Sequence, residues 1–435
     1  MQLGMLEARW RELVAARGPE RALTDRATGH AWSFTELAAI ADNAEPAWTG
    51  AQPGCARLVC PRGGGVGFIL EVLRGWRAGA VLCPLEPGQS PPAIPPPTDG
   101  ICHLKVTSGT TGVGRGVAFT PAQLAADVDQ LVNTMGLHPD SPNLSVISLA
   151  HSYGFSSLVL PLLCHGIPLI LSGGALPAAL QQAAQGQPPL TLPAVPALWR
   201  TWHEANVIPK TLRLAISAGA TLPLPLETAV YSTHGIKLHN FLGSTECGGI
   251  AYDPTPAPRT EPAWIGLPIS GVRLETTADG RLTVLAPSVA TGYWPPGEAP
   301  STRLGNGRFV TNDFAELAPD GGVWLHGRAS DVINIAGRKL LPETLETTLL
   351  EHPRVADCLV FGLPDASGRG ECVGVAVVRR GELAESELRD FVQSRVPAWQ
   401  VPRRWWWLTE LGADARGKRS RRDWRRRLLE ADRSP

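Results

Sequence analysis

The sequence predicts an α/β protein with a large N-terminal domain of layered α/β sheets and a small α+β C-terminal domain. Three observations support this class: a length of 435 residues, strand–helix alternation up to about residue 241, and a change to closely spaced short strands after Trp264. A chain of this length exceeds one typical domain. With 43% hydrophobic residues, it can bury a sizeable core. We therefore expect at least two domains.

The first part of the chain predicts layers with largely parallel strands. Ser33 and Glu36 form a capping box that begins a helix, and Thr120 with Pro121 begins a helix that ends near Met135. A further helix is expected over 65–78. Strands are expected at 57–60, 81–85, 102–106, 117–119, 144–149, 167–171, 190–195, 212–217 and 236–241. Strands that alternate with helices are typical of parallel sheets.

The pattern changes between about Trp264 and His326. Short strands separated by Gly, Asp and Asn turns predict a small distorted β-barrel. After Gly327 the chain returns to mixed structure, with helices over 342–351 and 384–396 and strands near 355–361 and 372–378. We place the domain boundary at 329–330, which gives domains 1–329 and 330–435.

Composition excludes several classes of protein. The formal net charge is zero, so no bulk attraction to nucleic acid or to an anionic membrane is expected. No charged-then-apolar leader opens the chain, which favours a cytoplasmic location. The most apolar run, 155–171, is too short and too interrupted for a membrane span, and we interpret it as a buried helix that turns into a strand. The eight cysteines show no zinc-ligand spacing, so we expect reduced thiols and no metal–thiolate site.

Residues 107–116, Thr-Ser-Gly-Thr-Thr-Gly-Val-Gly-Arg-Gly, form the most informative segment. Hydroxyl and amide donors among glycines can converge on an oxyanion, most plausibly a nucleotide phosphate. A flexible surface turn is the plain alternative, but the strands expected on both sides favour a shaped loop. The pattern is not Walker A, because Arg115 and Gly116 stand where that motif needs Lys and a hydroxyl residue.

The segment resembles the phosphate loop of the adenylate-forming ligase family, which reads roughly T-S-G-T-T-G-x-P-K-G. This family includes acyl-CoA synthetases, aryl-CoA ligases and adenylation domains that load carrier proteins. The resemblance assigns ATP binding to Thr107, Ser108, Gly109, Thr110, Thr111, Gly112 and Arg115. Gly114 and Arg115 depart from the family's Pro and Lys, and Arg115 replaces a point charge with a planar fork.

Three further segments follow in the family's order. His239 to Glu246 resembles the motif Y-G-x-T-E, which implies that Thr245 contacts phosphate and that Glu246 holds Mg²⁺, a cation that prefers oxygen ligands. The same motif implies that Asn240, Phe241 and Leu242 lie by the nucleotide; Leu242 stands at the family's adenine-facing aromatic position, for which Phe241 could compensate. Asp313 resembles the carboxylate that accepts both ribose hydroxyls, and Arg328 would reach the ribose. Ser330 aligns with the hinge about which the mobile C-terminal domain of the family rotates.

Lys418 in Arg-Gly-Lys-Arg resembles the catalytic lysine of the family's C-terminal domain. Only five lysines occur among 40 basic residues, so a retained lysine is informative. Its ammonium would stabilise charge on the reacting carboxylate and α-phosphate. The arginines around it can be a solvated chain end, a surface for an acidic carrier protein, or a contact for the phosphates of coenzyme A.

The expected acyl pocket follows the strand that ends at Leu149. A histidine at this position is often a core residue, but the family places His or an aromatic residue there, beside the acyl carboxylate; this implies a catalytic role for His151. Ser152 stands where relatives that activate amino acids have Asp, which disfavours an α-amino acid. The remaining residues of the expected pocket are mostly small: Tyr153, Gly154, Ala218, Gly219, Ala220 and Gly243, with Cys247 nearby.

The resemblance implies that the chain activates an aryl or fatty acid. Carboxylate and ATP would give acyl-adenylate and pyrophosphate with Mg²⁺, and the thiol of coenzyme A or of a carrier-protein phosphopantetheine would then capture the acyl group. Three alternatives stay open: an enzyme that stops at the adenylate or uses a non-thiol acceptor, a nucleotide-binding homologue that has lost activity, and an interaction protein that uses its basic end.

Overall fold

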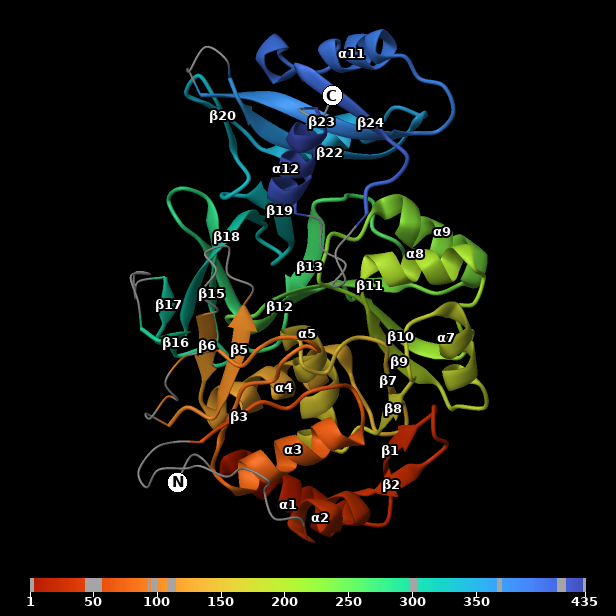
Figure 1. The fold of residues 1–435 in the computed structure, drawn as a ribbon, viewed down its shortest axis with the longest axis vertical. Coiled ribbons are helices and arrows are strands. Elements are labelled where there is room, and N and C mark those ends of the chain that lie inside the picture. Colours follow the sequence, from red (N-terminus) through yellow and green to blue (C-terminus); the bar gives the residue numbers. More distant parts are fainter. Residues whose placement is uncertain are drawn as a thin grey trace. The chain divides into compact units, whose positions relative to one another are not determined.

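The computed structural model describes residues 4–43, 57–92, 94, 97, 100–107, 115–296, 303–365, 370–412 and 420–432, without the side chains of Thr107 and Arg115 (Figure 1). The chain divides into two compact units. The first contains residues 1–275, 283–311 and 318–323, and the second contains 276–282, 312–317 and 324–435. The predicted domain boundary at 329–330 stays a prediction.

The first unit is built on a sheet with the strand order β13-β12-β11-β10-β9-β7-β8-β1-β2. Its strands are β1 (Arg21–Asp25), β2 (Ala31–Ser33), β7 (Asn143–Ser145), β8 (Leu169–Leu171), β9 (Leu190–Ala194), β10 (Leu212–Ser217), β11 (Leu238–Ser244), β12 (Gly248–Tyr252) and β13 (Trp264–Pro268). All neighbours from β1 through β8, β7, β9 and β10 to β11 pair in parallel, as the strand–helix alternation predicted. The β1–β2, β11–β12 and β12–β13 pairs are antiparallel.

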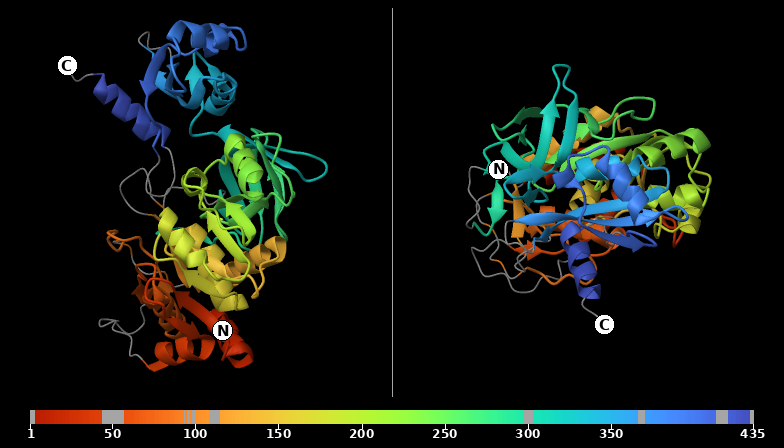
Figure 2. Two further views of the ribbon diagram at one scale, coloured as in Figure 1. Left: turned by 90° about the vertical axis from the view of Figure 1, so that its right-hand side faces the viewer. Right: turned by 90° about the horizontal axis from the view of Figure 1, so that it is seen from above.

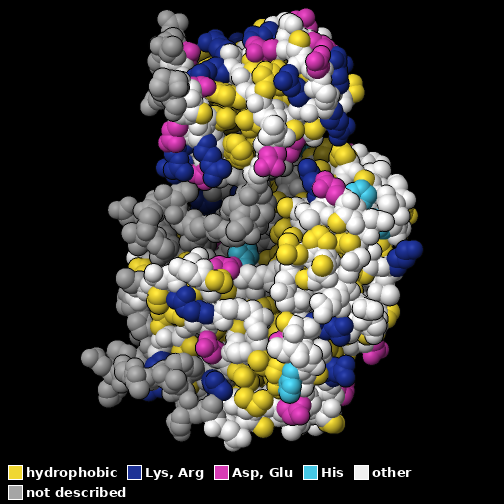
Figure 3. Space-filling model, turned by 45° about the vertical axis from the view of Figure 1, so that its right-hand side comes forward, with side chains coloured by type: hydrophobic (Ala, Val, Ile, Leu, Met, Phe, Trp, Pro, Cys, Tyr) yellow, Lys and Arg dark blue, Asp and Glu magenta, His cyan; other side chains and the backbone are white. Residues whose placement is uncertain are grey.

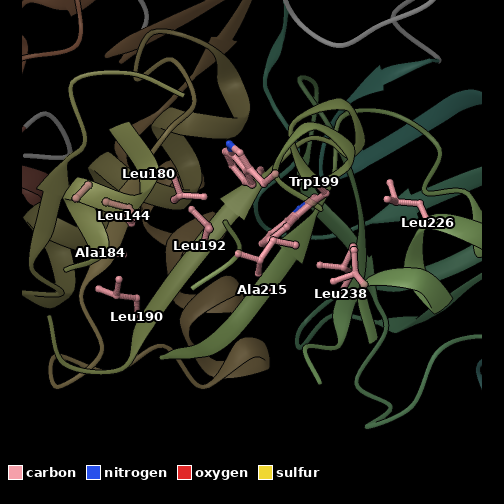
Figure 4. Close-up of a cluster of buried hydrophobic side chains, with 14 of the residues drawn as sticks. Leu144, Leu180, Ala184, Leu190, Leu192, Trp199, Ala215, Leu226 and Leu238 are labelled. Atoms are coloured by element: carbon pink, nitrogen blue, oxygen red, sulfur yellow. The ribbon is translucent and has the colours of Figure 1, made fainter. Parts of the chain in front are cut away.

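Helices cover both faces of this sheet. The helices of the unit are α1 (Met5–Arg17), α2 (Phe34–Asn43), α3 (Val66–Arg77), α4 (Pro121–Met135), α5 (Ser152–Gly154), the π-helix η1 (Phe155–Val159), α6 (Leu160–His165), α7 (Pro177–Ala184), α8 (Pro196–Glu204) and α9 (Leu224–His234). Side chains alternate along a strand. Ala215 of β10 therefore packs with Leu180 and Trp199 under α7 and α8 (Figure 4). Leu214 and Ile216 pack in the cluster that contains Leu131 and Met135 of α4.

A second sheet of the first unit carries the predicted phosphate loop. Its order is β16-β6-β5-β4-β3, with β3 (Leu58–Val59), β4 (Val81–Leu82), β5 (His103–Thr107), β6 (Arg115–Phe119) and β16 (Gly292–Trp294). The antiparallel pair β5–β6 ends at Thr107 and Arg115, so the strands expected on both sides of the loop are confirmed. The start of α4 predicted at Thr120 and Pro121 is also confirmed, and the structure shows a capping box there: Thr120 Oγ1 accepts from Gln123 N at 3.3 Å, and Gln123 Oε1 accepts from Thr120 N at 2.9 Å.

The short strands expected after Trp264 are present. β13 pairs with β12, and β16 pairs with β6. The others are β14 (Arg273–Thr276), β15 (Arg281–Leu285), β17 (Leu304–Gly305), β18 (Arg308–Leu317) and β19 (Val323–Arg328). β17 and β18 form a hairpin, with Gly305 opposite Arg308.

The second unit is a small α+β structure built around the three-stranded sheet β22-β23-β24. From residue 333 onward its elements are β20 (Ile333–Ile335), β21 (Arg338–Leu340), α10 (Pro342–Leu350), β22 (Val355–Pro364), β23 (Glu371–Arg379), α11 (Glu385–Gln393), the 3₁₀ turn η2 (Ala398–Gln400), β24 (Arg404–Leu408) and α12 (Arg421–Ala431). Val360 of β22 packs in the cluster with Leu345 of α10 and Leu388 of α11. Phe361, next along β22, packs with Leu428 of α12. The sheet is therefore covered on both faces (Figure 2).

Candidate active site

The predicted acid- and nucleotide-binding residues of the first unit gather at one edge of the large sheet. His151 follows β7, Ala218 follows β10, and Asn240 and Gly243 lie near the end of β11. The register places Ser217 beside Ala194 of β9 and Asn240 of β11. Because the carboxyl ends of parallel strands meet at the same edge, this is the expected place for a ligand in an α/β sheet.

Thr245 and Glu246 are the two central residues of a β-turn between β11 and β12. Cys247 N donates to Ser244 O at 3.3 Å, which closes the turn. Gly248 follows with φ +74°, a left-handed backbone conformation that favours glycine. The turn presents Thr245 and Glu246 as half-buried side chains, whereas Cys247, Gly248 and the following residues are buried.

Both carboxylate oxygens of Glu246 have a hydroxyl partner. Ser244 Oγ donates to Oε2, and Tyr293 Oη donates to Oε1 at 3.0 Å. These bonds orient the carboxylate and leave further lone pairs on each oxygen. A half-buried, oriented carboxylate is a suitable protein ligand for Mg²⁺, which binds through one or two carboxylates together with substrate phosphates. Among the described residues, no group of three or more His, Cys, Asp or Glu side chains could hold a metal ion, so any Mg²⁺ here would depend on Glu246 and the phosphates.

Phe241 and Leu242 point to different sides of β11. Phe241 is buried in the cluster with Leu131 and Ile216, and its ring centroid lies 6.1 Å from that of Tyr153. Leu242 is half-buried. The structure thus places Phe241 in the core, and it leaves Leu242 as the more accessible of the two side chains.

His151 is the N-cap of α5. Its Nδ1 accepts a hydrogen bond from Tyr153 N at 3.3 Å. An accepting Nδ1 requires the neutral tautomer with the proton on Nε2. The ring therefore carries an N–H donor of the kind that a substrate carboxylate would need.

The predicted acyl-pocket residues divide into buried and accessible ones. Ala218 is buried and packs in the same cluster as Tyr153, whose burial raises the pKa of its phenol well above the ordinary value. Ser152 is half-buried, Gly219 and Gly243 are exposed, and Ala220 is half-buried. A separate cavity of about 330 Å³ is lined by Asp25, Ser145, Ser172 and neighbouring glycines, and by none of the predicted site residues.

Gly154 is a position of close backbone approach. A β-carbon there would overlap the carbonyl oxygen of Ser148, which cannot move as a side chain can. Gly154→Ala is therefore expected to lower the free energy of unfolding by about 1–3 kcal/mol, the usual cost of overpacking a buried site. Urea denaturation followed by tryptophan fluorescence measures this change. Gly174→Ala, where the added methyl meets only Ala179 Cβ at 3.9 Å, is the control, and an equal loss in both variants would contradict the prediction.

In the second unit the two predicted ribose-binding residues form an ion pair. Arg328 Nε donates to Asp313 Oδ1 at 3.0 Å, and the Arg328 side chain is 64% exposed against 20% for Asp313. Ser330, the predicted hinge residue, donates from Oγ to Asp331 Oδ1 at 3.0 Å. The structure therefore brings Asp313 and Arg328 together and places Ser330 two residues after Arg328.

Arg421, at the start of α12, forms ion pairs with three carboxylates. Its guanidinium lies 3.1 Å from Asp331, 3.0 Å from Glu343 and 2.7 Å from Glu346. Burial raises the pKa of Glu346 to about 7, against the opposing attraction of Arg421. The N-terminal end of α12 is thus tied to the residue that follows Ser330 and to α10.

Because of Glu346, we expect the contact between α10 and β22 to be more stable in mild acid than at neutral pH. Its folded-state pKa lies above its unfolded value, so the folded state holds the proton more tightly and loses stability as pH rises from about 4.5 through 7. We expect the opening free energy of β22 to fall by about 1–3 kcal/mol between about pH 5 and pH 8. Hydrogen–deuterium exchange, corrected for intrinsic rates, measures this at Val360 N, which donates to Glu346 Oε1 at 2.7 Å. Glu346→Gln should flatten the dependence and Glu351→Gln should not; the same slope in both would contradict the prediction.

Several predicted residues lie outside the described part of the chain. These are Ser108, Gly109, Thr110, Thr111, Gly112, Gly114 and Lys418, and the side chains of Thr107 and Arg115. Their roles stay predictions. Conversely, sequence reasoning missed Tyr293, because it lies 47 residues from Glu246 and no local motif marks it.

The described residues contain no helix long and apolar enough to cross a membrane. The fold combines a parallel sheet that carries the predicted acid-binding residues at its carboxyl edge with a second sheet whose strands β5 and β6 flank the hydroxyl- and glycine-rich segment of the sequence. Together with the Thr245–Glu246 turn, these features define an enzyme of the nucleotide-dependent class.

The chain belongs to the AMP-binding enzyme family. The family model matches residues 20–294, and the model of the family's C-terminal domain matches residues 344–418. This confirms the adenylate-forming ligase superfamily that the Thr107–Gly112 motif indicated, together with the α/β fold class.

Two curated relatives and one solved structure illustrate the similarity. The chain is 27% identical over 360 residues to a long-chain-fatty-acid–CoA ligase of Bacillus subtilis (strain 168), covering 78% of this chain and 63% of the relative. It is 28% identical over 338 residues to a 2-succinylbenzoate–CoA ligase of Bacillus cereus (strain Q1), covering 74% and 69%. The crystal structure of ATP-bound MatB from Rhodopseudomonas palustris matches with a TM-score of 0.83 at 19% identity, covering 100% of both chains, which shows the shared fold. The chain thus spans less than two thirds of the first relative's length.

Proposed function

We propose that this protein activates a carboxylic acid with ATP and passes the acyl group to a thiol. The substrate carboxylate attacks the α-phosphate, pyrophosphate leaves, and an acyl-adenylate forms; the thiol then displaces AMP. The observation that carries this proposal is the Thr245–Glu246 turn. Its oriented carboxylate lies at the carboxyl edge of the parallel sheet, together with the apolar residues Tyr153 and Ala218.

The chain's own residues bind and orient the reactants. The Nε2–H of His151 donates to the substrate carboxylate, and the apolar side chains around Tyr153 hold the acyl group. Asp313 and Arg328 bind the ribose hydroxyls, and the residues from Thr107 to Gly112, together with Arg115, Thr245 and Lys418, bind phosphate. Asn240, Leu242 and Phe241 belong to the strand that flanks the nucleotide. Mg²⁺, held by Glu246, would supply charge to stabilise the leaving pyrophosphate.

The substrate class that we propose is an aryl or fatty acid. Tyr153, Ala218 and Phe241 form an apolar cluster, and Ser152 stands where relatives that activate amino acids have Asp. The relatives named above are ligases of a long-chain fatty acid and of 2-succinylbenzoate, so a fatty acid and an aryl acid both occur as substrates among them.

The thiol acceptor that we propose is coenzyme A, with an acyl carrier protein as the second candidate. Basic (Lys or Arg) and acidic side chains intermix over the face of the second unit that is visible in the upper part of Figure 3. An acidic carrier protein would be complemented better by a surface on which basic side chains predominate. We further propose that the enzyme acts in the cytoplasm and that Ser330 is the hinge of a mobile C-terminal domain.

A pyrophosphate-exchange screen tests the proposal. The full chain is incubated with Mg²⁺, ATP and labelled pyrophosphate across a panel of aryl, short-chain and long-chain acids. Exchange that depends on one class of acid, followed by thioester formation with coenzyme A, is the expected result. ATP binding without exchange for any acid would overturn the function and support a homologue that has lost activity. Adenylate formation without thioester, with coenzyme A and with carrier protein, would indicate a different acceptor.

A further inference from the structure

A buried ion pair contacts the hairpin that carries Thr245 and Glu246. Lys105 of β5 and Asp127 of α4 have side chains that are 3% and 1% exposed, and Lys105 Nζ lies 3.7 Å from Asp127 Oδ2. Ser156 of η1 joins them. Its Oγ accepts from Lys105 Nζ at 3.0 Å and donates to Asp127 Oδ2 at 2.6 Å. The three side chains therefore form one enclosed polar network.

The second carboxylate oxygen of Asp127 connects this network to the hairpin backbone. Asp127 Oδ1 accepts a hydrogen bond from Gly249 N at 3.3 Å. At Gly248, a β-carbon would overlap the same Asp127 carboxylate, and the residue also has φ +74°. Only glycine satisfies both conditions. Because Gly248 has no side chain, the Asp127 carboxylate can approach the backbone directly after the turn.

The network links three segments to which we assign roles in the reaction. Lys105 precedes Thr107 by two residues on β5, the strand that leads into the predicted phosphate loop. Ser156 lies two residues after the end of α5, which His151 caps. Gly249 lies three residues after Glu246. A movement of any one segment would strain hydrogen bonds to the other two.

Burial of Lys105 is costly, and stability alone does not account for it. Apolar residues of similar volume are often as stable as a buried ion pair or more so. Burial lowers the pKa of Lys105, while Asp127 opposes that change. The Phe119 ring, 4.6 Å from Nζ, adds a cation–π contact. The ammonium is enclosed, so it is too buried to touch a substrate phosphate directly.

We propose that Lys105 and Asp127 are positioning residues for Mg²⁺–ATP. They fix the spacing between the Thr245–Glu246 turn and the strand that leads into the phosphate loop. This proposal rests on the proposed function of the same site, and it assigns a role to two residues that no motif of the sequence marks.

Lys105→Met tests the proposal, with Lys237→Met as the matched control. Lys237 is also a buried lysine, 7% exposed, and it contacts Glu227 and, at 2.6 Å, Asp253. It precedes β11, at the end of the hairpin opposite the turn, about 20 Å from Ser244 at the usual rise per residue. Both variants remove a buried ammonium, but only the ammonium of Lys105 belongs to the network that contacts the hairpin.

Three quantities are measured for the full-length variants: KM for Mg²⁺–ATP in pyrophosphate exchange, KM for the acid, and the rate of thioester formation from supplied acyl-adenylate. Lys105→Met is expected to raise KM for Mg²⁺–ATP by about 10–100-fold, the usual effect of losing a group that supports a metal ligand. KM for the acid and the thioester rate should change less than about threefold. Lys237→Met should lower the melting temperature without a selective change in KM.

Asp127→Asn and Ser156→Ala provide the same test if Lys105→Met does not fold. The double variant Lys105→Met/Asp127→Asn should be no more impaired than the worse single variant, because both changes act on one network. Equal KM values for Mg²⁺–ATP in Lys105→Met and Lys237→Met, or parallel losses in all three quantities, would overturn the positioning role. If the wild-type protein shows no exchange with any acid, the proposed function fails. Calorimetric affinities for Mg²⁺–ATP of the same proteins then decide the positioning role independently.

Discussion

Lys418→Ala is expected to slow acyl-adenylate formation by about 10²–10³-fold, because a preorganised charge on the reacting groups contributes on this scale. Thioester formation from supplied acyl-adenylate should be largely spared, since the phosphoryl chemistry is then complete. Single-turnover assays of the two half-reactions measure the two effects separately.

Lys210→Ala is the control for Lys418→Ala. It removes the same charge from an exposed position of the first unit to which no role is assigned. Both half-reactions should proceed at the wild-type rate in this control. Equal losses of the two half-reactions in Lys418→Ala would exclude the proposed role of Lys418 in adenylation.

Glu246→Gln is expected to lower the rate of adenylation by about 10²-fold, within the range seen when one electrostatic contributor is removed from an active site. The amide has the shape of the carboxylate, so the turn should fold, but it lacks the negative charge that attracts Mg²⁺. The Mg²⁺ concentration that gives half-maximal exchange should rise as well. Pyrophosphate exchange measured across a Mg²⁺ titration gives both values.

Tyr293→Phe separates the charge of Glu246 from its orientation. This variant removes the hydroxyl that donates to Glu246 Oε1 at 3.0 Å and keeps the carboxylate. Its loss should be smaller, about 3–10-fold, as for a single neutral hydrogen bond. If Glu246→Gln shows the wild-type dependence on Mg²⁺, then Glu246 is not the metal ligand.

Local signals in the sequence predicted the elements well. The capping box at Ser33 and the N-cap at Thr120 are both formed: Glu36 Oε2 accepts from Ser33 N at 2.7 Å, and Thr120 Oγ1 accepts from Gln123 N. The run from Phe155 to Leu171, interpreted as a buried helix that turns into a strand, contains η1, α6 and β8. These features were predictable because capping and hydrophobic patterning act between residues a few positions apart.

The candidate site was only partly predictable. The positions of His151, Ala218, Thr245 and Glu246 near strand ends follow from motif order and from the parallel sheet. The side of β11 to which Phe241 points was not evident, and the structure assigns it to the core with Tyr153. Alternation along a strand is simple, but which face is buried depends on the helices that pack against it.

The sequence by itself determined the family, the α/β class and the order of the motifs, because each motif is contiguous and strand–helix alternation requires parallel pairing. Only the tertiary structure decided which side chains hold those motifs in place. Tyr293 reaches Glu246 across 47 residues, and Lys105 reaches Ser156 across 51. Such contacts arise when separate strands and helices pack together, and no pattern within a short stretch of sequence encodes the pairing.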